Sequence, residues 1–349
     1  MAAMSTAPAI AVMAAPSSCT ARMTLMPSSR SATLAPCPSN PGRTMRSTAL
    51  AMSALAVALS LAACQSIPSS SIVADAAAAT QPAPAANDTV AADDNLNAVL
   101  WMQHSAEYRA VSETIYRAAG DKLDDALDTS PQDALVPEER ENASILREKP
   151  PAVIMDVDET VLDNSPYQAR LVREGHEYNS GTWDAWVLEK QAQALPGVVD
   201  FAKAATARGV TIVYLSNRGE HLQAATLANL RAVGMPVQDD SVFLGLGTVV
   251  EGCKQEGSDK SCRRILANRH YRVLMQFGDQ LGDFVKIQAN TPEARDKLHD
   301  EYAHWFGERW WMLPNPSYGS WESAVFDKAG KQSRTERRRA KREALDTGN

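Results

Sequence analysis

The sequence lacks an excess of positive charge. Its 349 residues contain 35 Lys and Arg against 42 Asp and Glu, which gives a formal net charge of −7. Proteins that bind nucleic acid usually carry a basic patch or stripe, so this balance excludes nucleic acid as the main partner. Only the C-terminal tail, residues 326–349, departs from it, with eight basic residues within fifteen positions. Such a tail is typical either of a solvated helix that frays or of a segment attracted to anionic lipid or lipopolysaccharide phosphate.

The sequence also lacks a hydrophobic run long enough to cross a bilayer. A mostly apolar stretch, residues 49–61, follows an arginine and precedes Ala-Ala-Cys. A charged start, a short apolar segment and small residues before a cleavage point are the layout of a secretory signal. We therefore expect translation to start at Met45, with residues 45–63 as the signal peptide and residues 1–44 as an upstream extension that is not translated. A longer but genuine leader is the alternative.

The residues around the expected cleavage point indicate a lipid anchor. Leu-Ala-Ala-Cys64 resembles a bacterial lipobox, which implies that Cys64 carries lipid as the first residue of the mature chain. Because Gln65 rather than Asp follows, the resemblance favours the outer membrane, with the domain facing the periplasm or the cell surface. Residues 64–95 are rich in Ala, Ser and Pro, so we expect them to form a disordered tether.

Cysteine is scarce, with five residues in the whole chain. Cys19 and Cys37 fall in the upstream extension and Cys64 would be lipidated, which leaves Cys253 and Cys262. Two cysteines nine positions apart, in a Gly-, Ser- and Lys-containing loop of an exported protein, favour one disulfide. Two free thiols or half of a metal site are the alternatives, although no Cys-x-x-Cys or paired His supports zinc.

Two carboxylates stand directly after an apolar, strand-like run. Residues 152–155 read Ala-Val-Ile-Met, and Asp156 and Asp158 follow. In open α/β sheets, ligands bind outside the carboxyl ends of the strands. Asp156 is placed to attack as a covalent nucleophile, and Asp158 can pass a proton to the leaving oxygen and from the incoming water. Because two such close carboxylates repel each other, we expect Mg²⁺ between them, since this ion prefers oxygen ligands.

Two later strand-like runs also end in polar side chains, although a turn or a helix cap is the common role of such residues. The first run ends at Ser216 and Asn217. Ser216 and the backbone N–H groups of the following helix can bind a phosphate, and Asn217 is assigned to the substrate. The second run ends at Asp279, which would complete the Mg²⁺ shell, while Asp283 is placed to orient that shell or to hold a metal-bound water.

A cation is needed beside the phosphoryl oxygens, because the charge on the transferred group must be offset. Lys260 stands just before a helical segment at a fitting position in the chain. Lys254, Arg263 and Arg264 are its competitors for this role.

Several of these strings together resemble a known family. Residues 156–160, Asp-Val-Asp-Glu-Thr, resemble the first motif of the haloacid dehalogenase-like (HAD) phosphatases. Their continuation through Tyr167 resembles one branch, the class C acid phosphatases, which are bacterial lipoproteins that include 5′-nucleotidases. Ser216, Lys260 and Asp279 follow in the order of the other three motifs. This resemblance implies that Mg²⁺ is held by Asp156, by the carbonyl of Asp158 and by Asp279, and that Ser216 and Lys260 hold the phosphoryl oxygens.

The predicted fold is α/β. Strand and helix signals alternate four or five times, and the short apolar strands favour a mostly parallel sheet covered on both faces. The resemblance makes this a Rossmann-like HAD core over residues 96–325, with a small helical and aromatic lid inserted between residues 162 and 196. A single helix is expected over residues 97–127, because apolar residues recur there at helical spacing.

The lid and the end of the domain contain the aromatic residues that the resemblance assigns to the substrate. An aromatic near Trp183 is implied to stack on a nucleobase, although Trp186 lies only three residues away. Tyr318, in a turn near the end of the domain, would be the second side of this aromatic clamp. The alternative is that these side chains simply pack the lid and the turn.

These observations predict a Mg²⁺-dependent phosphomonoesterase that acts through an aspartyl-phosphate. Its partner would be a small-molecule phosphomonoester, such as a nucleoside 5′-monophosphate or nicotinamide mononucleotide, and the resemblance implies that members can form homodimers. Two alternatives come from other classes. One is a non-catalytic surface lipoprotein that captures nucleotide or haem, and the other is a structural anchor of the outer membrane.

Overall fold

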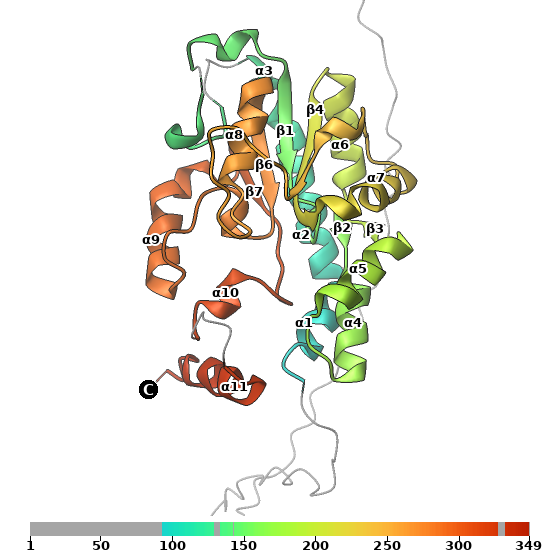
Figure 1. Ribbon diagram of the computed structural model, residues 1–349, viewed down its shortest axis with the longest axis vertical. Coiled ribbons are helices and arrows are strands. Elements are labelled where there is room, and N and C mark those ends of the chain that lie inside the picture. The colour runs from blue at the N-terminus through green and yellow to red at the C-terminus, as the bar shows by residue number, and fades with distance from the viewer. Residues whose placement is uncertain (1–92, 129–132, 142, 327–331, 349) are drawn as a thin grey trace, which may run out of the picture. The chain divides into compact units, whose positions relative to one another are not determined.

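A single sheet of five parallel strands organises the domain (Figure 1). The structure is a computed structural model, and it describes residues 93–128, 133–141, 143–326 and 332–348. The strands stand in the order β5-β4-β1-β6-β7, which confirms the predicted α/β class and parallel sheet. Their bounds are β1 Pro151–Met155, β4 Thr211–Gly219, β5 Phe243–Leu246, β6 Arg272–Gly278 and β7 Trp310–Met312.

The order of the strands creates a topological switch point beside β1. From β1 the chain proceeds outward through β4 and β5, and then returns to the other side of β1 for β6 and β7. The crossover connections therefore leave the sheet in opposite directions on the two sides of β1. In open sheets of this kind, the ligand crevice lies outside the carboxyl ends of the two strands where the order reverses. The predicted acids follow β1 and β6, which are these two strands.

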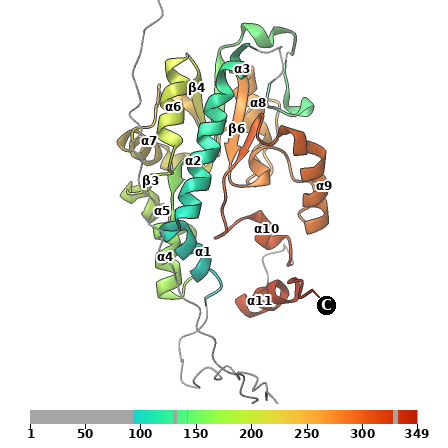
Figure 2. The ribbon, with the colours of Figure 1, turned by 180° about the vertical axis from the view of Figure 1, so that it is seen from behind.

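The central strand is continuously apolar because it is buried on both faces. Val153 and Met155 belong to a core shared with helices α2 and α6, whereas Ala152 and Ile154 belong to a second core shared with α8. Figure 2 shows α2 and α6 in front of the sheet, on the face that the larger core occupies. The helix bounds are α2 Ala106–Asp121, α6 Val198–Ala207 and α8 Ser261–His270.

The N-terminal part of the domain contains three helices, where the sequence pattern predicted one continuous helix. These helices are α1 Leu96–His104, α2 Ala106–Asp121 and α3 Leu123–Asp128. The break between the first two lies at Ser105, whose backbone is extended at φ −83° and ψ 137°. Its hydroxyl accepts the Tyr108 backbone N–H at 3.0 Å. The prediction was wrong here because a serine that caps a new helix competes with continuing the old one.

The predicted lid insertion is helical. Strands β2 Leu162–Asp163 and β3 Gln193–Ala194 pair antiparallel and enclose the two lid helices, α4 Ser165–Glu174 and α5 Ser180–Glu189. Helix α4 ends at a glycine in the left-handed conformation, which is a favourable place for a helix to stop. The paired strands fix both ends of the insertion to the core beside β1, so the lid stands next to the carboxyl end of the sheet.

The remaining helices precede or connect the strands or follow the last strand, β7. Among the described residues, the other helices are η1 Pro137–Glu139, η2 Ala143–Glu148, η3 Glu220–Leu222, α7 Gln223–Ala232, η4 Asp240–Val242, η5 Leu281–Asp283, α9 Pro292–Tyr302, η6 Ala303–Trp305, α10 Ser320–Ser323 and α11 Arg334–Glu343.

Residues 1–92 lie outside the described part of the chain. The expected leader, the signal peptide, Cys64 and most of the tether therefore fall outside the residues that the structure describes. Across the residues that are described, no helix is both long enough and apolar enough to span a bilayer.

The structure joins Cys253 to Cys262 in a disulfide with a Cα–Cα distance of 5.6 Å. This bond closes the loop that precedes α8, and Lys260 lies inside the closed segment. The cross-link therefore limits how far Lys260 can move when the rest of the loop fluctuates.

Replacing both cysteines by serine should lower the free energy of unfolding by roughly 2 to 3 kcal/mol, because a loop of this length gains that much conformational freedom in the unfolded chain. Urea denaturation followed by circular dichroism measures the change. A reductant should destabilise the wild type to the same extent and leave the double variant unaffected. Equal stability of the wild type with and without reductant would contradict a stabilising disulfide.

Candidate active site

Three carboxylates converge at the switch point of the sheet. Asp156 follows β1, Asp279 follows β6 and Asp283 ends the short helix η5. One carboxylate oxygen from each lies within 4.8 Å of the others. The backbone N–H of Asp156 donates to the Phe277 carbonyl of β6 at 3.0 Å, so the pairing of the two central strands sets where these acids stand. Oxygen donors this close are the ligand set of a hard divalent cation.

Burial and mutual repulsion perturb these acids strongly. Burial raises the pKa of Asp156 to about 7, and the charges of Asp283 and Asp158 add to this effect while Lys260 opposes it. Burial, followed by the charges of Asp283 and Asp156, raises the pKa of Asp279 well above its ordinary value. Clustered carboxylates with such pKa values are expected where a cation binds or a proton is shared.

Lys260 is the cation of this cluster. Its ammonium group donates to Asp156 and, at 2.7 Å, to Asp283. Burial alone would lower the pKa of Lys260, but the charges of the two carboxylates outweigh burial and raise it. Of its three competitors, Arg264 instead pairs with Glu139 at 2.6 Å. Lys260, at the N-terminus of α8, therefore lies between the carboxylates of Asp156 and Asp283.

Asp158 stands apart from the three clustered acids. Its carboxylate pairs with Arg218 at 2.8 Å and accepts the Asn164 side-chain amide at 2.9 Å. The Asp158 side chain is 16% exposed, whereas that of Arg218 is 1% exposed. The Asp158 carboxylate is thus held outside the cation cluster but open to the pocket. The family resemblance assigned the backbone carbonyl of Asp158, and not its carboxylate, to the metal, so this position of the carboxylate is compatible with that prediction.

Ser216 and Asn217 lie within β4, which continues to Gly219 instead of ending before Ser216 as the sequence predicted. Ser216 is fully buried, and its hydroxyl accepts the Arg218 backbone N–H at 3.1 Å. Arg263, the remaining arginine competitor of Lys260, donates to the Ser216 carbonyl and, at 2.7 Å, to the Asn217 side chain. Asn217 lines the pocket whereas Ser216 is not among its lining residues. Arg263 therefore positions this part of β4, in which Asn217 and not Ser216 reaches the pocket.

The two aromatic residues assigned to substrate both line the pocket. Trp183 packs edge-on against Tyr167 with ring centroids 5.1 Å apart, and the Arg218 guanidinium lies 5.6 Å from the Trp183 ring. Trp186 is buried instead, and its indole N–H donates to Asn164 at 2.8 Å. Trp183 rather than Trp186 is thus the tryptophan that a ligand in the pocket would meet.

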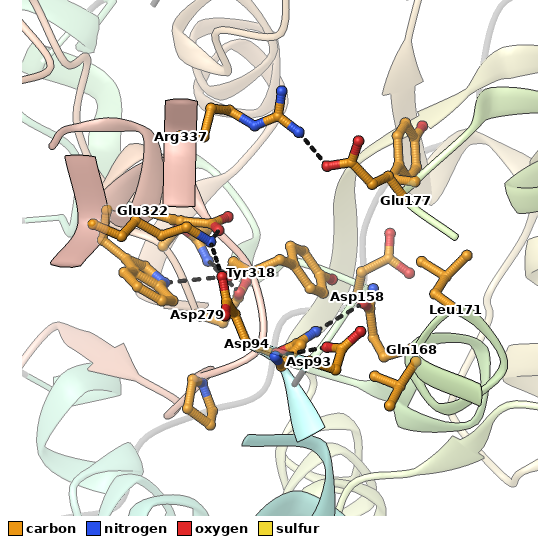
Figure 3. A pocket seen from close by; sticks show the side chains of 18 of the residues that line it. Asp93, Asp94, Asp158, Gln168, Leu171, Glu177, Asp279, Tyr318, Glu322 and Arg337 are labelled. Carbon is orange, nitrogen blue, oxygen red and sulfur yellow. Dashed lines mark hydrogen bonds and ion pairs between the residues drawn. The ribbon is translucent and has the colours of Figure 1, made fainter. Parts of the chain in front are cut away.

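A pocket of about 980 Å³ joins these residues. In Figure 3, Asp158, Tyr318 and Asp279 face the same space as residues of the lid and of the C-terminal segment. Such a volume is at the upper end of the range for small-molecule sites. The pocket therefore has room for a leaving group much larger than the phosphate itself.

Comparison with known proteins assigns the chain to a family. A sequence model described as the HAD superfamily, subfamily IIIB (acid phosphatase), matches residues 57–321. The chain belongs to this acid phosphatase family. The class C acid phosphatase from Bacillus anthracis, solved with tungstate bound, is 34% identical with a TM-score of 0.62, and the match covers 73% of this chain and 98% of that one. A second structure of that protein is 32% identical with a TM-score of 0.61, at the same coverage.

Two curated relatives of the chain are plant proteins with lower sequence identity. The Stem 31 kDa glycoprotein of Glycine max is 28% identical over 165 residues, which are 47% of this chain and 58% of that protein. Vegetative storage protein 1 of Arabidopsis thaliana is 24% identical over 166 residues, which are 47% of this chain and 54% of that protein. The chain spans about half the length of these curated relatives.

The acid phosphatase site also contains residues that the sequence analysis did not single out. Arg218 stands two residues beyond Ser216, and Asn164 connects Asp158 with Trp186. Glu159, directly after Asp158, is fully buried and takes a left-handed backbone conformation with φ 54°. The signal for Arg218 and Glu159 was their place beside assigned residues, but sequence alone does not show which way these side chains turn.

Glu159 connects the segment after β1 with Tyr318. Its carboxyl group accepts the backbone N–H of Asn164 at 2.8 Å and the hydroxyl of Tyr318. Burial, reinforced by the charges of Asp158 and Asp279, raises the pKa of Glu159 well above its ordinary value. Burial therefore favours the protonated form of Glu159, and its hydrogen bond holds the Tyr318 hydroxyl at this side of the pocket.

Glu159→Gln should change the free energy of unfolding by less than about 1 kcal/mol, because the amide oxygen can accept the Asn164 N–H while the amide nitrogen donates to the Tyr318 hydroxyl. Glu159→Leu should cost roughly 2 to 4 kcal/mol, since it leaves the Asn164 N–H and the Tyr318 hydroxyl without their partner. Urea denaturation of the two variants measures the difference. Equal losses in both variants would show that shape at this position, rather than hydrogen bonding, is what matters.

Proposed function

We propose that this protein is a metal-dependent phosphomonoesterase that works through a covalent aspartyl-phosphate. The observation that carries the proposal is that Asp156 and Asp158 lie in different surroundings. The first is buried with Lys260 and two further acids, whereas the second is held by Arg218 at the edge of the pocket. Two carboxylates in such different surroundings are suited to two different chemical roles.

In the proposed reaction, a carboxylate oxygen of Asp156 attacks the phosphorus of the ester. A bond from Asp156 to phosphorus forms, the bond from phosphorus to the ester oxygen breaks, and Asp158 gives its proton to the departing alcohol. Water then replaces the aspartate at phosphorus, and Asp158 takes a proton from that water. Lys260 offsets the charge on the transferred group in both steps.

The clustered acids fit a divalent cation, and we assign Mg²⁺ to them. Asp156 and Asp279 would hold it, with the Asp158 carbonyl as a further ligand, and Asp283 would orient Asp156 through Lys260. When bound, the ion screens the negative charges of the nucleophile and of the substrate from each other. The protein's own residues then need only to position the ester and to move protons.

The substrate class in this proposal is a phosphomonoester with an aromatic leaving group. Trp183 and Tyr318 line the same pocket as Asp158, so a base in the pocket would meet both rings. Nucleoside 5′-monophosphates and nicotinamide mononucleotide have this shape. Stacking on an aromatic ring is worth roughly 1 to 3 kcal/mol per base, which is enough to favour such esters over simple alkyl phosphates.

A non-catalytic role is the competing proposal. One of the plant relatives is named a vegetative storage protein, and capture of nucleotide or haem by a surface lipoprotein would also use an aromatic pocket. The acid cluster argues against both, because storage or binding alone does not require a carboxylate nucleophile beside a buried lysine. Release of phosphate is the measurement that separates these proposals.

The decisive experiment is phosphate release by the purified protein from p-nitrophenyl phosphate, adenosine monophosphate and nicotinamide mononucleotide, with Mg²⁺ or with EDTA. We expect Mg²⁺-dependent release that favours the two nucleotides. Release from the aryl ester alone would keep the catalytic acids and remove the aromatic clamp from the proposal. No release from any of the three esters would support the binding role instead.

Metal removal should also make stability depend on pH. The folded-state pKa of Asp156, about 7, lies above the ordinary value of 3.8, so its contribution to stability is complete below the ordinary pKa and is lost as the pH rises through about 7. In EDTA, Tm should therefore fall between pH 6 and pH 8. Saturating Mg²⁺ should restore roughly 5 to 10 °C at pH 8 and less at pH 6, because protons compete with the metal.

Asp156→Asn is the matched control for this pH effect, because it removes the titrating group and keeps its shape. Differential scanning fluorimetry of both proteins at several pH values, with and without Mg²⁺, gives the comparison. A Mg²⁺-induced shift of Tm that is the same at pH 6 and pH 8 in the wild type would contradict metal binding at Asp156.

The proposed location is the outer membrane, with lipid at Cys64 as the anchor. The support for it is the signal-like segment 45–63 followed by a lipobox-like sequence. Metabolic labelling with a fatty acid, compared between the wild type and Cys64→Ser, would test the anchor. Homodimerisation, which the family resemblance implies, belongs to the same proposal, and analytical ultracentrifugation would test it.

A further inference from the structure

The C-terminal helix α11 forms one wall of the substrate pocket. Figures 1 and 2 both place it next to α10, at the end of the domain where α1 and α4 also lie. It starts with a capping box formed by Ser333 and Glu336. The hydrogen bonds of this box stabilise the first turn of the helix. The family match stops at residue 321, so this wall stands outside the matched part of the chain. Its pocket-lining residues are Arg334, Arg337, Arg338, Lys341 and Arg342, and Leu345 just beyond the helix also lines the pocket.

Ion pairs attach α11 to three other parts of the pocket rim. Arg337 pairs with Glu177 of the lid (Figure 3). Lys341 pairs with Glu322 of α10 at 2.7 Å, and Arg334 contacts Asp93, just before α1, at 3.2 Å. The helix is therefore held against the pocket from several sides, and its cations line the same pocket as Lys260.

The cationic face is not fully neutralised by these acids. Asp94 serves two cations at once, since Arg338 lies 2.8 Å and Lys341 3.6 Å from its carboxylate. Arg342 makes no ion pair with any residue that the structure describes, although it lines the pocket. Four cations of α11 thus share four carboxylates, Asp93, Asp94, Glu177 and Glu322, and Arg342 is a fifth cation with no acid paired to it among the described residues.

These pairs are also easy to exchange. The side chains of Lys341 and Glu322 are 30% and 32% exposed, and ion pairs of this kind contribute only about 0 to 1 kcal/mol each. A phosphate group carries more charge than a carboxylate and accepts two parallel hydrogen bonds from a guanidinium. An anionic group in the pocket could therefore take over arginines of α11 at little cost to the helix.

We propose that α11 is an anion-binding subsite for the leaving group, and that the preferred substrates are phosphomonoesters with a second phosphate at their far end. This inference rests on the proposed function and specifies its substrate class. One phosphate lies at Asp156 and Lys260, and the other reaches Arg337, Arg338 and Lys341. The pocket of about 980 Å³ contains both groups of residues, so one molecule of suitable length can contact both.

The subsite differs from both interpretations of the basic tail that the sequence allowed. A fraying helix would leave these cations to solvent, and a lipid-binding segment would present them to a membrane. In the structure, cations of α11 line the same pocket as the catalytic acids. A third arrangement is compatible with the same ion pairs, namely a cover that keeps substrate out, and the experiment below separates it from the subsite.

A series of α,ω-alkanediol bisphosphates from two to ten carbons, with hexyl phosphate as the monophosphate reference, probes the subsite in the full chain. The wild type should hydrolyse bisphosphates of one optimal length with a kcat/KM about 10- to 100-fold above that of hexyl phosphate, the gain expected from one or two charge-assisted hydrogen bonds. The triple variant R337Q/R338Q/K341Q should lose this preference.

Arg339→Gln is the matched control on the same helix. Arg339 lies 3.8 Å from Glu343 of its own helix and does not line the pocket, so its removal should leave the bisphosphate preference intact. Thermal denaturation of all variants verifies that α11 substitutions leave the domain folded. A wild type without length preference, or a triple variant that keeps it, would overturn the subsite. A rise of kcat/KM for all esters alike in the triple variant would also overturn it, in favour of a cover.

Failure of the proposed function gives a different result. A protein that hydrolyses none of these esters refutes the phosphomonoesterase, yet calorimetry in the presence of EDTA can still compare the binding of the optimal bisphosphate with that of hexyl phosphate. Tighter binding of the bisphosphate that disappears in the triple variant would keep the subsite without catalysis. Equal binding of the two compounds would reject the subsite as well.

Discussion

Asp156→Asn is expected to abolish phosphate release, with kcat lowered by about 10⁴-fold or more, as for other covalent nucleophiles. The amide cannot form an acyl-phosphate, although it keeps the size of the carboxylate. Lys260 retains its second partner, Asp283, at 2.7 Å, so the domain should remain folded. Steady-state release of phosphate from p-nitrophenyl phosphate, with circular dichroism as the folding test, measures the effect.

The control for this substitution is an equally conservative change far from the site. Asp200 lies exposed in the first turn of α6, and Asp200→Asn should retain the wild-type kcat. Calorimetry should show that Asp156→Asn still binds nucleotide, since the aromatic side chains are unchanged. If Asp156→Asn kept more than about 1% of the wild-type turnover, another group would have to be the nucleophile.

The second large effect is expected for Asp158→Asn, and it should depend on the leaving group. For adenosine monophosphate, whose alcohol leaves poorly, loss of the general acid should lower kcat by about 10² to 10⁴-fold. p-Nitrophenolate leaves without protonation, so formation of the aspartyl-phosphate from the aryl ester should be much less affected. Asp158→Asn keeps an oxygen acceptor for Arg218, which preserves the geometry of the site.

A burst experiment distinguishes the two steps in this variant. Because hydrolysis of the intermediate still lacks its base, the aryl ester should give a rapid burst of p-nitrophenol close to the enzyme concentration, followed by slow turnover. The wild type, in which both steps retain Asp158, serves as the comparison. An equal loss for both esters, without a burst, would mean that Asp158 positions the substrate and does not transfer protons.

The order of the chemical groups along the chain was predictable from sequence. Asp156, Ser216 and Asp279 each follow an apolar run, and parallel strands deliver such residues to one edge of a sheet because side-by-side strands end together. The α/β class was predictable for the same reason, since strands buried on both faces read as continuous apolar runs. The single helix over residues 97–127 was wrong, because Ser105 can either continue a helix or cap a new one.

The contacts between distant residues could not be predicted in this way. The Asp158–Arg218 pair joins residues sixty positions apart, and the Glu159–Tyr318 bond joins residues 159 positions apart. Whether Trp183 or Trp186 faces the pocket depends on how α5 is rotated against the core, and both residues lie on the same helix. Local pattern does not contain such rotations, because packing of the whole lid sets them.

The sequence by itself determined the chemistry of this protein: which acids, which lysine and which aromatic residues are present, and in what order the strands deliver them. Only the tertiary structure decided how these groups are partnered. It separated Asp158 from the three clustered acids, buried Glu159 under Tyr318 and turned a basic tail toward the pocket. The physical reason is that residue type and spacing fix local conformation, whereas burial, pKa and ion pairing depend on neighbours that are brought together only when the sheet, the lid and the C-terminal helix pack.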